Sequence, residues 1–199
     1  MENICQSGGA RGADLVWGTH AARIGHRVIH FSFAGHRTRA PADQLVVLSE
    51  EELRRADDHL AIANKTLLRT WPPATAHSAN LLRRDWHQVR NAARVYAVAR
   101  FGADGQIEGG TAWGVTMFID LHGGGPCDAY LFEPRLRRWL AWNSAWLPIG
   151  MPPPPRGIWA GIGTRDLDAV GEAAIGAACA LAVETSEPRE PDLRQSPDA

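Results

Sequence analysis

The sequence contains no apolar run that approaches the roughly 20 residues needed to cross a bilayer, so a membrane-spanning protein is not expected. Cysteine is also scarce. Cys5, Cys127 and Cys179 are odd in number, lie far apart and form neither a CxxC pair nor a Cys/His cluster with metal-ligand spacing. We therefore interpret them as buried or incidental thiols, and we expect neither a metal site nor a cofactor.

A strongly basic charge is missing too. The net charge is −1, whereas proteins that bind nucleic acid usually carry a basic face, so long DNA or RNA is a poor candidate partner. Lys65 is the single lysine among 21 basic residues. This excess of arginine indicates either phosphate recognition by planar guanidinium groups or a GC-rich genome. The first residues lack the basic start and apolar stretch of a secretory signal, which predicts a cytoplasmic protein.

Short apolar runs alternate with helical patterns along the chain, as in βαβ units. We expect strands at 3–6, 26–33, 95–99, 129–132 and 158–162, and a short strand or a turn at 138–142. We expect helices at 14–23, 49–67 (opened by the Ser49/Glu52 capping box), 78–90 (capped by Ser78), 112–121 and 168–183. Parallel strands need crossover helices, so these patterns predict an α/β fold: a single three-layer Rossmann-like domain over residues 1–183 with a mainly parallel sheet. The acidic, proline-containing stretch 184–199 is expected to be a poorly ordered tail.

Three of the predicted strands run into glycines that precede a helix, in the segments SGGARGAD (7–14), GGT (109–111) and GIGTRD (161–166). A helix N-terminus offers unpaired N–H groups, and glycine lets the backbone approach a ligand closely. In a parallel sheet the three turns fall on the carboxyl edge, where open α/β sheets bind their ligands. The phosphate-binding candidates are Ser7, Gly8, Gly9, Arg11, Gly12, Asp14, Gly109, Gly110, Thr111, Gly163, Thr164 and Arg165.

Each glycine also has the simpler interpretation of a tight turn. No segment completes a GxGxxG fingerprint or a GxxxxGK[ST] loop, which disfavours nicotinamide redox chemistry and ATP hydrolysis. Arg84 and Asn91 lie seven apart on one predicted helix face, where they either reach a ligand or make ordinary surface contacts. Trp113 either stacks on a base or packs in the core.

A further tryptophan cluster, formed by Trp139, Trp142 and Trp146, lies within eight residues of sequence. It indicates either a packed flap or a contact between subunits, and we expect a homo-oligomer.

Four segments together resemble the SLOG superfamily, which includes the LOG phosphoribohydrolases and the Rossmann domain of DNA-processing protein A. They are SGGARGAD (7–14), LLRRDWHQVRNA (81–92), GGTAWGVTMFID (109–120) and AGIGTRDL (160–167). The match is nearest to an uncharacterised bacterial and phage branch. In the usual SLOG order the GxGSR-type strand precedes the SGGAxGAD strand, whereas here it closes the chain. The resemblance therefore implies a circularly permuted domain, and such domains are physically plausible because domain termini often lie close together.

The resemblance also implies binding of a nucleotide or nucleoside phosphate at the glycine turns, and in some members cleavage of the N-glycosidic bond of nucleoside 5′-monophosphates. LOG enzymes carry a glutamate in a PGGxGTxxE block, but Gly114 stands at that place here. Glu108, Asp14 and Asp85 are alternative catalytic carboxylates. Each has a structural interpretation as well: a solvated loop residue, a helix cap and an ion-pair partner of a neighbouring arginine, respectively.

Three functions follow as hypotheses. The first is nucleotide binding without chemistry, as in a ligand sensor, which the missing LOG glutamate favours. The second is hydrolysis of an N-glycosidic bond by a relocated carboxylate. The third is an accessory role in DNA processing, which the near-neutral charge disfavours.

Overall fold

The structure, a computed structural model, describes residues 2–184 of the chain. One eight-stranded sheet has the order β3-β2-β1-β8-β4-β5-β6-β7. Its strands are β1 (Ile4–Ser7), β2 (Arg27–Phe33), β3 (Leu45–Leu48), β4 (Arg94–Val98), β5 (Ala129–Glu133), β6 (Arg138–Trp142), β7 (Trp146–Ile149) and β8 (Ile158–Gly163). The helices are α1 (Ala13–Arg23), α2 (Glu50–Arg54), α3 (Asp57–Leu67), α4 (Ala76–Val89), α5 (Thr111–Leu121), α6 (Ala169–Glu184) and the 3-10 helix η1 (Ala42–Gln44).

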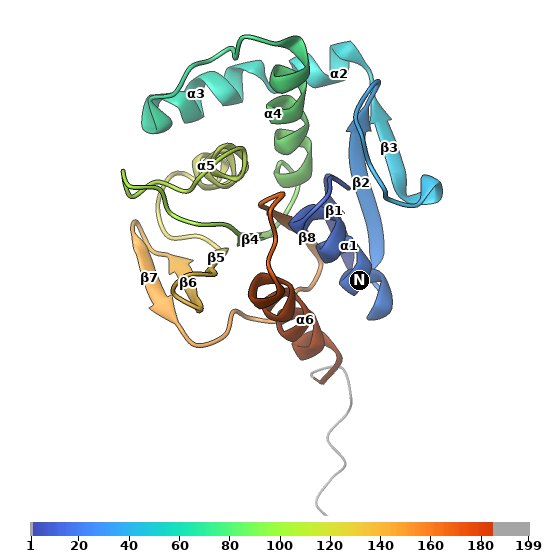
Figure 1. Ribbon diagram of the computed structural model, residues 1–199, viewed down its shortest axis with the longest axis vertical. Helices are drawn as coiled ribbons and strands as arrows, with labels where there is room; N and C mark the ends of the chain where they lie inside the picture. The colour runs from blue at the N-terminus through green and yellow to red at the C-terminus, as the bar shows by residue number, and fades with distance from the viewer. Residues whose placement is uncertain (1, 185–199) are drawn as a thin grey trace, which may run out of the picture.

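The sheet is the middle of three layers (Figure 1). Helices α3, α4 and α5 cover one face, where Leu60, Val89 and Phe118 pack on Val95 and Ile162. Helices α1 and α6 cover the other face, and their side chains meet the alternate residues of the same strands in a second core that includes Trp17, Tyr96, Trp159 and Ile175. The predicted α/β fold, with a mainly parallel sheet between helical layers, is therefore confirmed.

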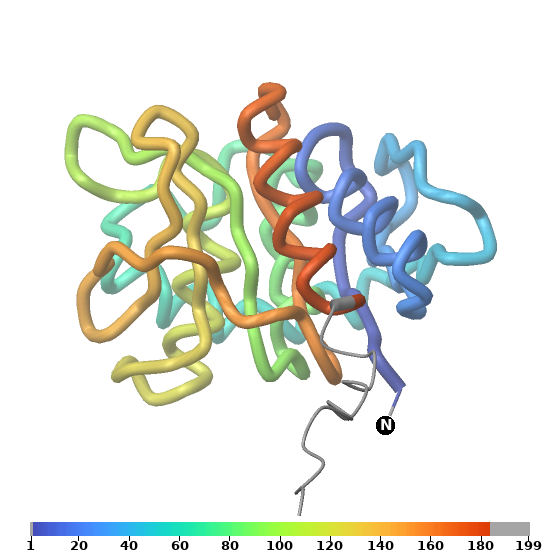
Figure 2. Tube along the Cα trace, turned by 90° about the horizontal axis from the view of Figure 1, so that it is seen from below, coloured from blue at the N-terminus to red at the C-terminus, as the bar shows by residue number. Residues whose placement is uncertain are grey.

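The last strand of the chain lies in the middle of the sheet. Strand β8 pairs in parallel with β1 on one side and with β4 on the other. The strands β3, β2, β1, β8, β4 and β5 are all parallel, and the antiparallel strands β6 and β7 extend the sheet beyond β5. Helix α6 follows β8 and runs back toward the end of the sheet at which strand β1 begins (Figure 2).

The element predicted as one helix from 49 to 67 is two helices, so that prediction is wrong in part. The capping box is present, with reciprocal bonds between Ser49 and Glu52, but α2 ends at Arg54 and α3 starts at Asp57. The two apolar faces have different partners: Leu53 packs with Phe31 and Phe33, whereas Leu60 joins the core around α5. The two helices therefore pack against different parts of the core.

Two further local predictions differ from the structure. Helix α4 begins at Ala76 with Thr75 as its N-cap, and Ser78 donates its backbone N–H to the Thr75 hydroxyl instead of capping the helix itself. The short edge strands β3 and β7 were not predicted, because Val46, Val47 and Leu147 are exposed and the segments lack a clear alternation.

The tryptophan cluster packs within the chain. Trp139 lies against Phe132 with ring centroids 5.3 Å apart, and Trp142 lies against Trp146 at the same separation. Assembly into a homo-oligomer stays a prediction, as does the single-domain boundary at 183. The predicted tail falls outside the described residues from 185 onward. None of the helices in residues 2–184 has the length and apolar character that crossing a bilayer requires.

Candidate functional site

The three glycine turns meet at the carboxyl ends of β1, β8 and β4, which are adjacent in the sheet. They enclose a pocket of about 530 Å³. Its lining residues come from these turns, from α4 and the loop before it, and from the loop that follows β4: Ala10, Asp14, Pro73, Ser78, Leu81, Leu82, Arg84, Asp85, Ala99, Arg100, Glu108, Gly109, Gly110, Thr111, Ile162, Gly163, Thr164, Arg165 and Asp166. The sheet therefore assembles one site from residues that lie as far apart in sequence as Ala10 and Asp166.

Most residues of the turn after β1 lie behind the pocket and do not line it. The Ser7 hydroxyl lies in the interior, 2.8 Å from the Asp14 carbonyl oxygen and 2.6 Å from that of Gly161. Gly9 adopts a φ of 60°, and its carbonyl accepts a 2.6 Å hydrogen bond from the Thr38 hydroxyl. Of this turn, Ala10 and Asp14 reach the pocket.

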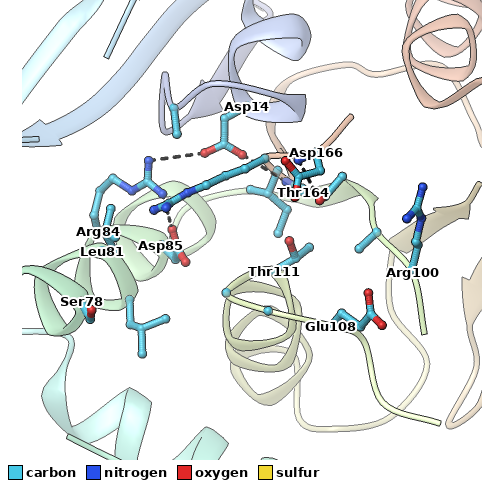
Figure 3. A pocket seen from close by; sticks show the side chains of 18 of the residues that line it. Asp14, Ser78, Leu81, Arg84, Asp85, Arg100, Glu108, Thr111, Thr164 and Asp166 are labelled. Carbon is cyan, nitrogen blue, oxygen red and sulfur yellow. Dashed lines mark hydrogen bonds and ion pairs between the residues drawn. The ribbon is translucent and has the colours of Figure 1, made fainter. Parts of the chain in front are cut away.

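Arg84, on α4, is held between two carboxylates (Figure 3). Its Nη1 donates to the Gly8 carbonyl at 2.8 Å and lies 3.4 Å from Asp14 Oδ2, while Nη2 donates to Asp85 Oδ1 at 2.7 Å. All three side chains are largely buried. Burial raises the pKa of Asp14 to about 7, outweighing the opposite effect of Arg84, and burial likewise raises the pKa of Asp85.

Helix α5 presents its N-terminus to the pocket. Gly110 is the N-cap residue and no side chain caps the helix, so its first backbone N–H groups are not covered by a side chain. The preceding Gly109 has a φ of 68°. Arg69 fixes this turn from outside, donating to the carbonyl oxygens of Gly109 at 2.8 Å and Ile107 at 2.7 Å.

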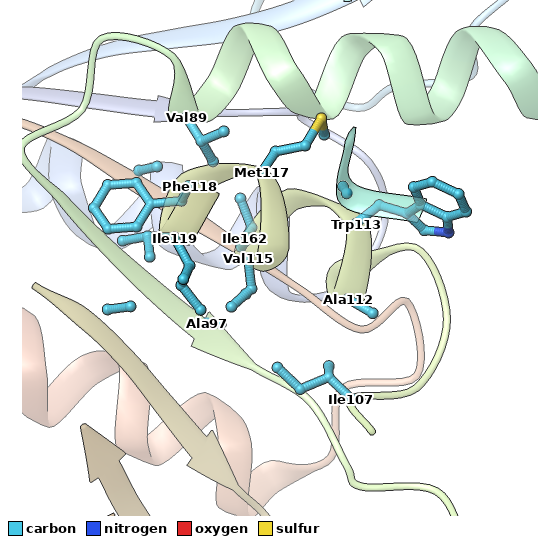
Figure 4. Packing of buried hydrophobic residues seen from close by; sticks show 14 of the residues in the cluster. Val89, Ala97, Ile107, Ala112, Trp113, Val115, Met117, Phe118, Ile119 and Ile162 are labelled. Atoms are coloured by element: carbon cyan, nitrogen blue, oxygen red, sulfur yellow. The ribbon is translucent and has the colours of Figure 1, made fainter. Parts of the chain in front are cut away.

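The body of α5 is anchored in the core, which keeps its N-terminus in place (Figure 4). Val115 and Phe118 are 1% and 0% exposed. Trp113 is buried beside Trp71, with ring centroids 5.9 Å apart. The core interpretation of Trp113 is therefore confirmed, and its ring does not line the pocket.

The turn after β8 closes the third side. Gly163 donates its N–H to Asp14 Oδ1 at 3.1 Å, and a Cβ at this position would collide with the carbonyl of Val98. Thr164 bridges two neighbours: its N–H donates to the Val98 carbonyl at 2.8 Å, and its own carbonyl accepts from Ala13 N at 2.9 Å. Arg165 lines the pocket and makes no ion pair within residues 2–184.

The structure brings together most of the residues predicted from the sequence. The pocket includes Asp14, Arg84, Asp85, Glu108, Gly109, Gly110, Thr111, Gly163, Thr164 and Arg165. The remaining candidates lie outside its lining: Ser7, Gly8, Gly9, Arg11, Gly12 and Asn91.

Two arguments made from the sequence are wrong in detail. Helix α4 ends at Val89, so the exposed Asn91 lies in the following turn and does not share a helix face with Arg84. Asp14 is not a helix cap, because the α1 N-cap is Gly12 and the Asp14 carboxylate accepts from Gly163 instead. The interpretation of Asp85 as an ion-pair partner of its neighbouring arginine is confirmed.

Sequence reasoning missed Arg100 and Asp166. Arg100 comes directly after the apolar run of β4, a position at the carboxyl edge that could have identified it. It lies on the far side of the pocket from Arg84, as does Glu108, and its Nη2 is 3.2 Å from Asp168 Oδ2. The half-exposed Glu108 lies 3.8 Å from Arg135.

The pocket lining therefore carries three arginines and four carboxylates, of which Arg84, Asp14 and Asp85 form one buried cluster. The buried Arg84 cluster forms one wall, and the uncapped α5 N-terminus and Arg165 supply the groups suited to an anion. Among residues 2–184, no group of three or more His, Cys, Asp and Glu side chains is placed to hold a metal ion.

Comparison with known proteins adds no further constraint: no family model, no curated protein and no solved structure matches this chain.

Proposed function

We propose that this protein binds a nucleotide or nucleoside phosphate in the pocket at the carboxyl edge. The observation that carries the proposal is the α5 N-terminus, which opens into the pocket with Gly110 as its N-cap and without a side-chain cap. Such a helix end attracts a phosphate through its N–H groups and its partial positive charge. Arg165, which has no ion-pair partner in the described part of the chain, adds a guanidinium group to the same pocket.

The neighbouring features suit the rest of such a ligand. The pocket wall formed by Leu81, Leu82 and Ile162 is apolar and offers a surface for a base. The volume of about 530 Å³ lies within the range of small-molecule sites. These features support a mononucleotide-sized ligand.

The resemblance to SLOG proteins supports the same proposal, and we propose that the chain is a circularly permuted member of that superfamily. Strand β8 and helix α6 would come first in an unpermuted chain, and α6 leads back to the side at which β1 starts (Figure 2). Joining α6 to β1 would therefore preserve the sheet order, including the place of β8 between β1 and β4.

A thermal-shift screen of nucleoside mono-, di- and triphosphates tests the proposed binding. A ligand at 100 times its Kd stabilises the folded state by about 2.7 kcal/mol, which for a chain of this length raises Tm by about 5 to 10 °C. No shift with any nucleotide would contradict the proposal.

Two glycine variants locate the site. Gly109→Ala places a side chain at a φ of 68° beside the pocket, and Gly105→Ala does so at a φ of 75° in the adjoining loop, with no atoms within 4 Å in either case. The two substitutions therefore impose a similar backbone strain on the folded protein. We expect Gly109→Ala to abolish the ligand-induced shift and Gly105→Ala to retain it; loss in both or in neither would contradict binding at the α5 turn.

A second candidate function is hydrolysis of the N-glycosidic bond of a nucleoside 5′-monophosphate. It is favoured by Asp14, a pocket carboxyl whose pKa of about 7 suits proton transfer near neutral pH. Chromatography of each stabilising nucleotide after incubation separates the two functions. Release of free base supports the hydrolase, and stabilisation without release supports a sensor.

A further inference from the structure

Asp85 carries a free carboxylate oxygen at the edge of the pocket. Its Oδ1 accepts from Arg84 Nη2 at 2.7 Å and from Gln88 Nε2 at 3.1 Å. No hydrogen bond to Oδ2 is formed within residues 2–184. The side chain is 12% exposed and lines the pocket, so Oδ2 is an oriented acceptor that a ligand can reach.

This free oxygen lies beside the turn that precedes α5. A Cβ built on Gly110 would be 3.6 Å from Asp85 Oδ2, and one built on Gly114, a turn further along α5, would be 3.7 Å from Asp85 Cβ. These distances place the Asp85 carboxylate of α4 against the first turn of α5, within van der Waals reach of a side chain at either glycine. A ligand whose phosphate contacts the N-terminus of α5 would place its adjoining atoms near Oδ2.

The other charged groups of this wall are already engaged. Arg84 contacts the Gly8 carbonyl and two carboxylates, so it does not provide an excess positive charge for a phosphate. Asp14 uses Oδ1 for Gly163 N and Oδ2 for Arg84. Of the two carboxylates that contact Arg84, Asp85 is the one with an oxygen that makes no hydrogen bond or ion pair within residues 2–184.

We propose that Asp85 is a specificity-determining residue that accepts a hydrogen bond from a ribose hydroxyl of the bound ligand. A carboxylate oxygen accepts hydrogen bonds and repels a second phosphate, so the group it recognises next to the phosphate is a neutral donor. A single free oxygen suits one hydroxyl better than the paired N–H groups of a base edge. The pocket thus selects ribonucleoside phosphates over deoxyribonucleoside phosphates, an inference that rests on the proposed nucleotide binding.

Isothermal titration of the full chain with ribonucleoside 5′-monophosphates and their 2′-deoxy and 3′-deoxy counterparts tests this selection. A hydrogen bond to a charged group corresponds to about 10- to 100-fold in affinity. We expect the wild type to lose at least about tenfold in affinity when the recognised hydroxyl is absent. In Asp85→Asn, where a carboxamide replaces the carboxylate, we expect that ratio to fall below about threefold.

Asp57→Asn is the matched control, because Asp57, the first residue of α3, pairs with Arg83 of α4 at 2.6 Å but lies outside the pocket lining. It should keep the wild-type ratio. Equal affinity of the wild type for ribose and both deoxyribose forms would overturn the proposal even if Asp85→Asn did not fold. So would an unchanged ratio in a folded Asp85→Asn. Absence of binding by every nucleotide would instead refute the underlying nucleotide site, and this inference with it.

Discussion

The buried carboxyl of Asp14 makes a quantitative prediction about stability and pH. Its pKa rises from 3.8 to about 7 in the folded protein because burial disfavours the charged form. Between these values the folded protein keeps a proton that the unfolded chain releases, so lowering the pH through this range stabilises the fold. Above pH 7 the ionised carboxyl costs the folded state about 4 kcal/mol, at about 1.4 kcal/mol for each pH unit of displacement.

The perturbation is Asp14→Asn, which removes the titration but keeps the size of the side chain and an oxygen that can accept from Gly163 N. From pH 8 to pH 5 the wild type regains about 2.5 kcal/mol through Asp14, and the variant regains none of it. Buried His30, whose pKa is lowered to about 4 by burial and by Arg84, contributes the opposite slope below pH 6.5. The difference between variant and wild type cancels the His30 contribution.

The assay is urea unfolding at pH 5, 6, 7 and 8 for both proteins. The stability of Asp14→Asn relative to wild type should increase by about 2.5 kcal/mol from pH 5 to pH 8. Asp14→Ala should give a parallel curve at lower stability, because it also loses the hydrogen bond from Gly163. A constant difference between Asp14→Asn and wild type across this range would refute the argument that burial controls this carboxyl.

Two further predictions concern the α5 turn and the centre of the sheet. Arg69→Ala removes both hydrogen bonds to the carbonyl oxygens of Ile107 and Gly109, so nucleotide affinity measured by titration should fall about tenfold. Arg69→Lys should not restore this affinity, because one ammonium group cannot span both acceptors. Retained affinity in Arg69→Ala would contradict this. Gly161→Ala places a Cβ 2.5 Å from Cγ of the fully buried Trp17, so urea unfolding should show a loss of about 3 kcal/mol. Gly125→Ala, which meets no atom within 4 Å, is the control, and a loss below about 1 kcal/mol at Gly161 would disprove the predicted clash.

The convergence of the glycine turns could be predicted because it depends on a local rule. Each turn follows a short apolar strand, and parallel strands place such turns on one edge whatever their order. The candidates Gly110 and Gly163 therefore line the same pocket although they lie far apart in sequence.

Contacts between distant elements could not be predicted in the same way. Arg84 follows Asp14 by 70 positions, and no local pattern indicates that two carboxylates occupy its guanidinium group. The break at Ala56 between α2 and α3 was missed for the same reason: the apolar spacing continues through it, and only the two different packing partners separate the helices. The end of α4 before Asn91 is likewise set by the tight turn that leads into β4.

The place of β8 has a consequence for how the molecule is made. The strands β3, β2 and β1 form one half of the sheet and β4 to β7 the other, and among the strands of residues 2–184 β8 alone pairs with both halves. During synthesis from the N-terminus, the two halves have no shared strand until residues 158–163 have emerged. The pocket spans that junction, so the proposed ligand site cannot form before residues 158–166 have left the ribosome.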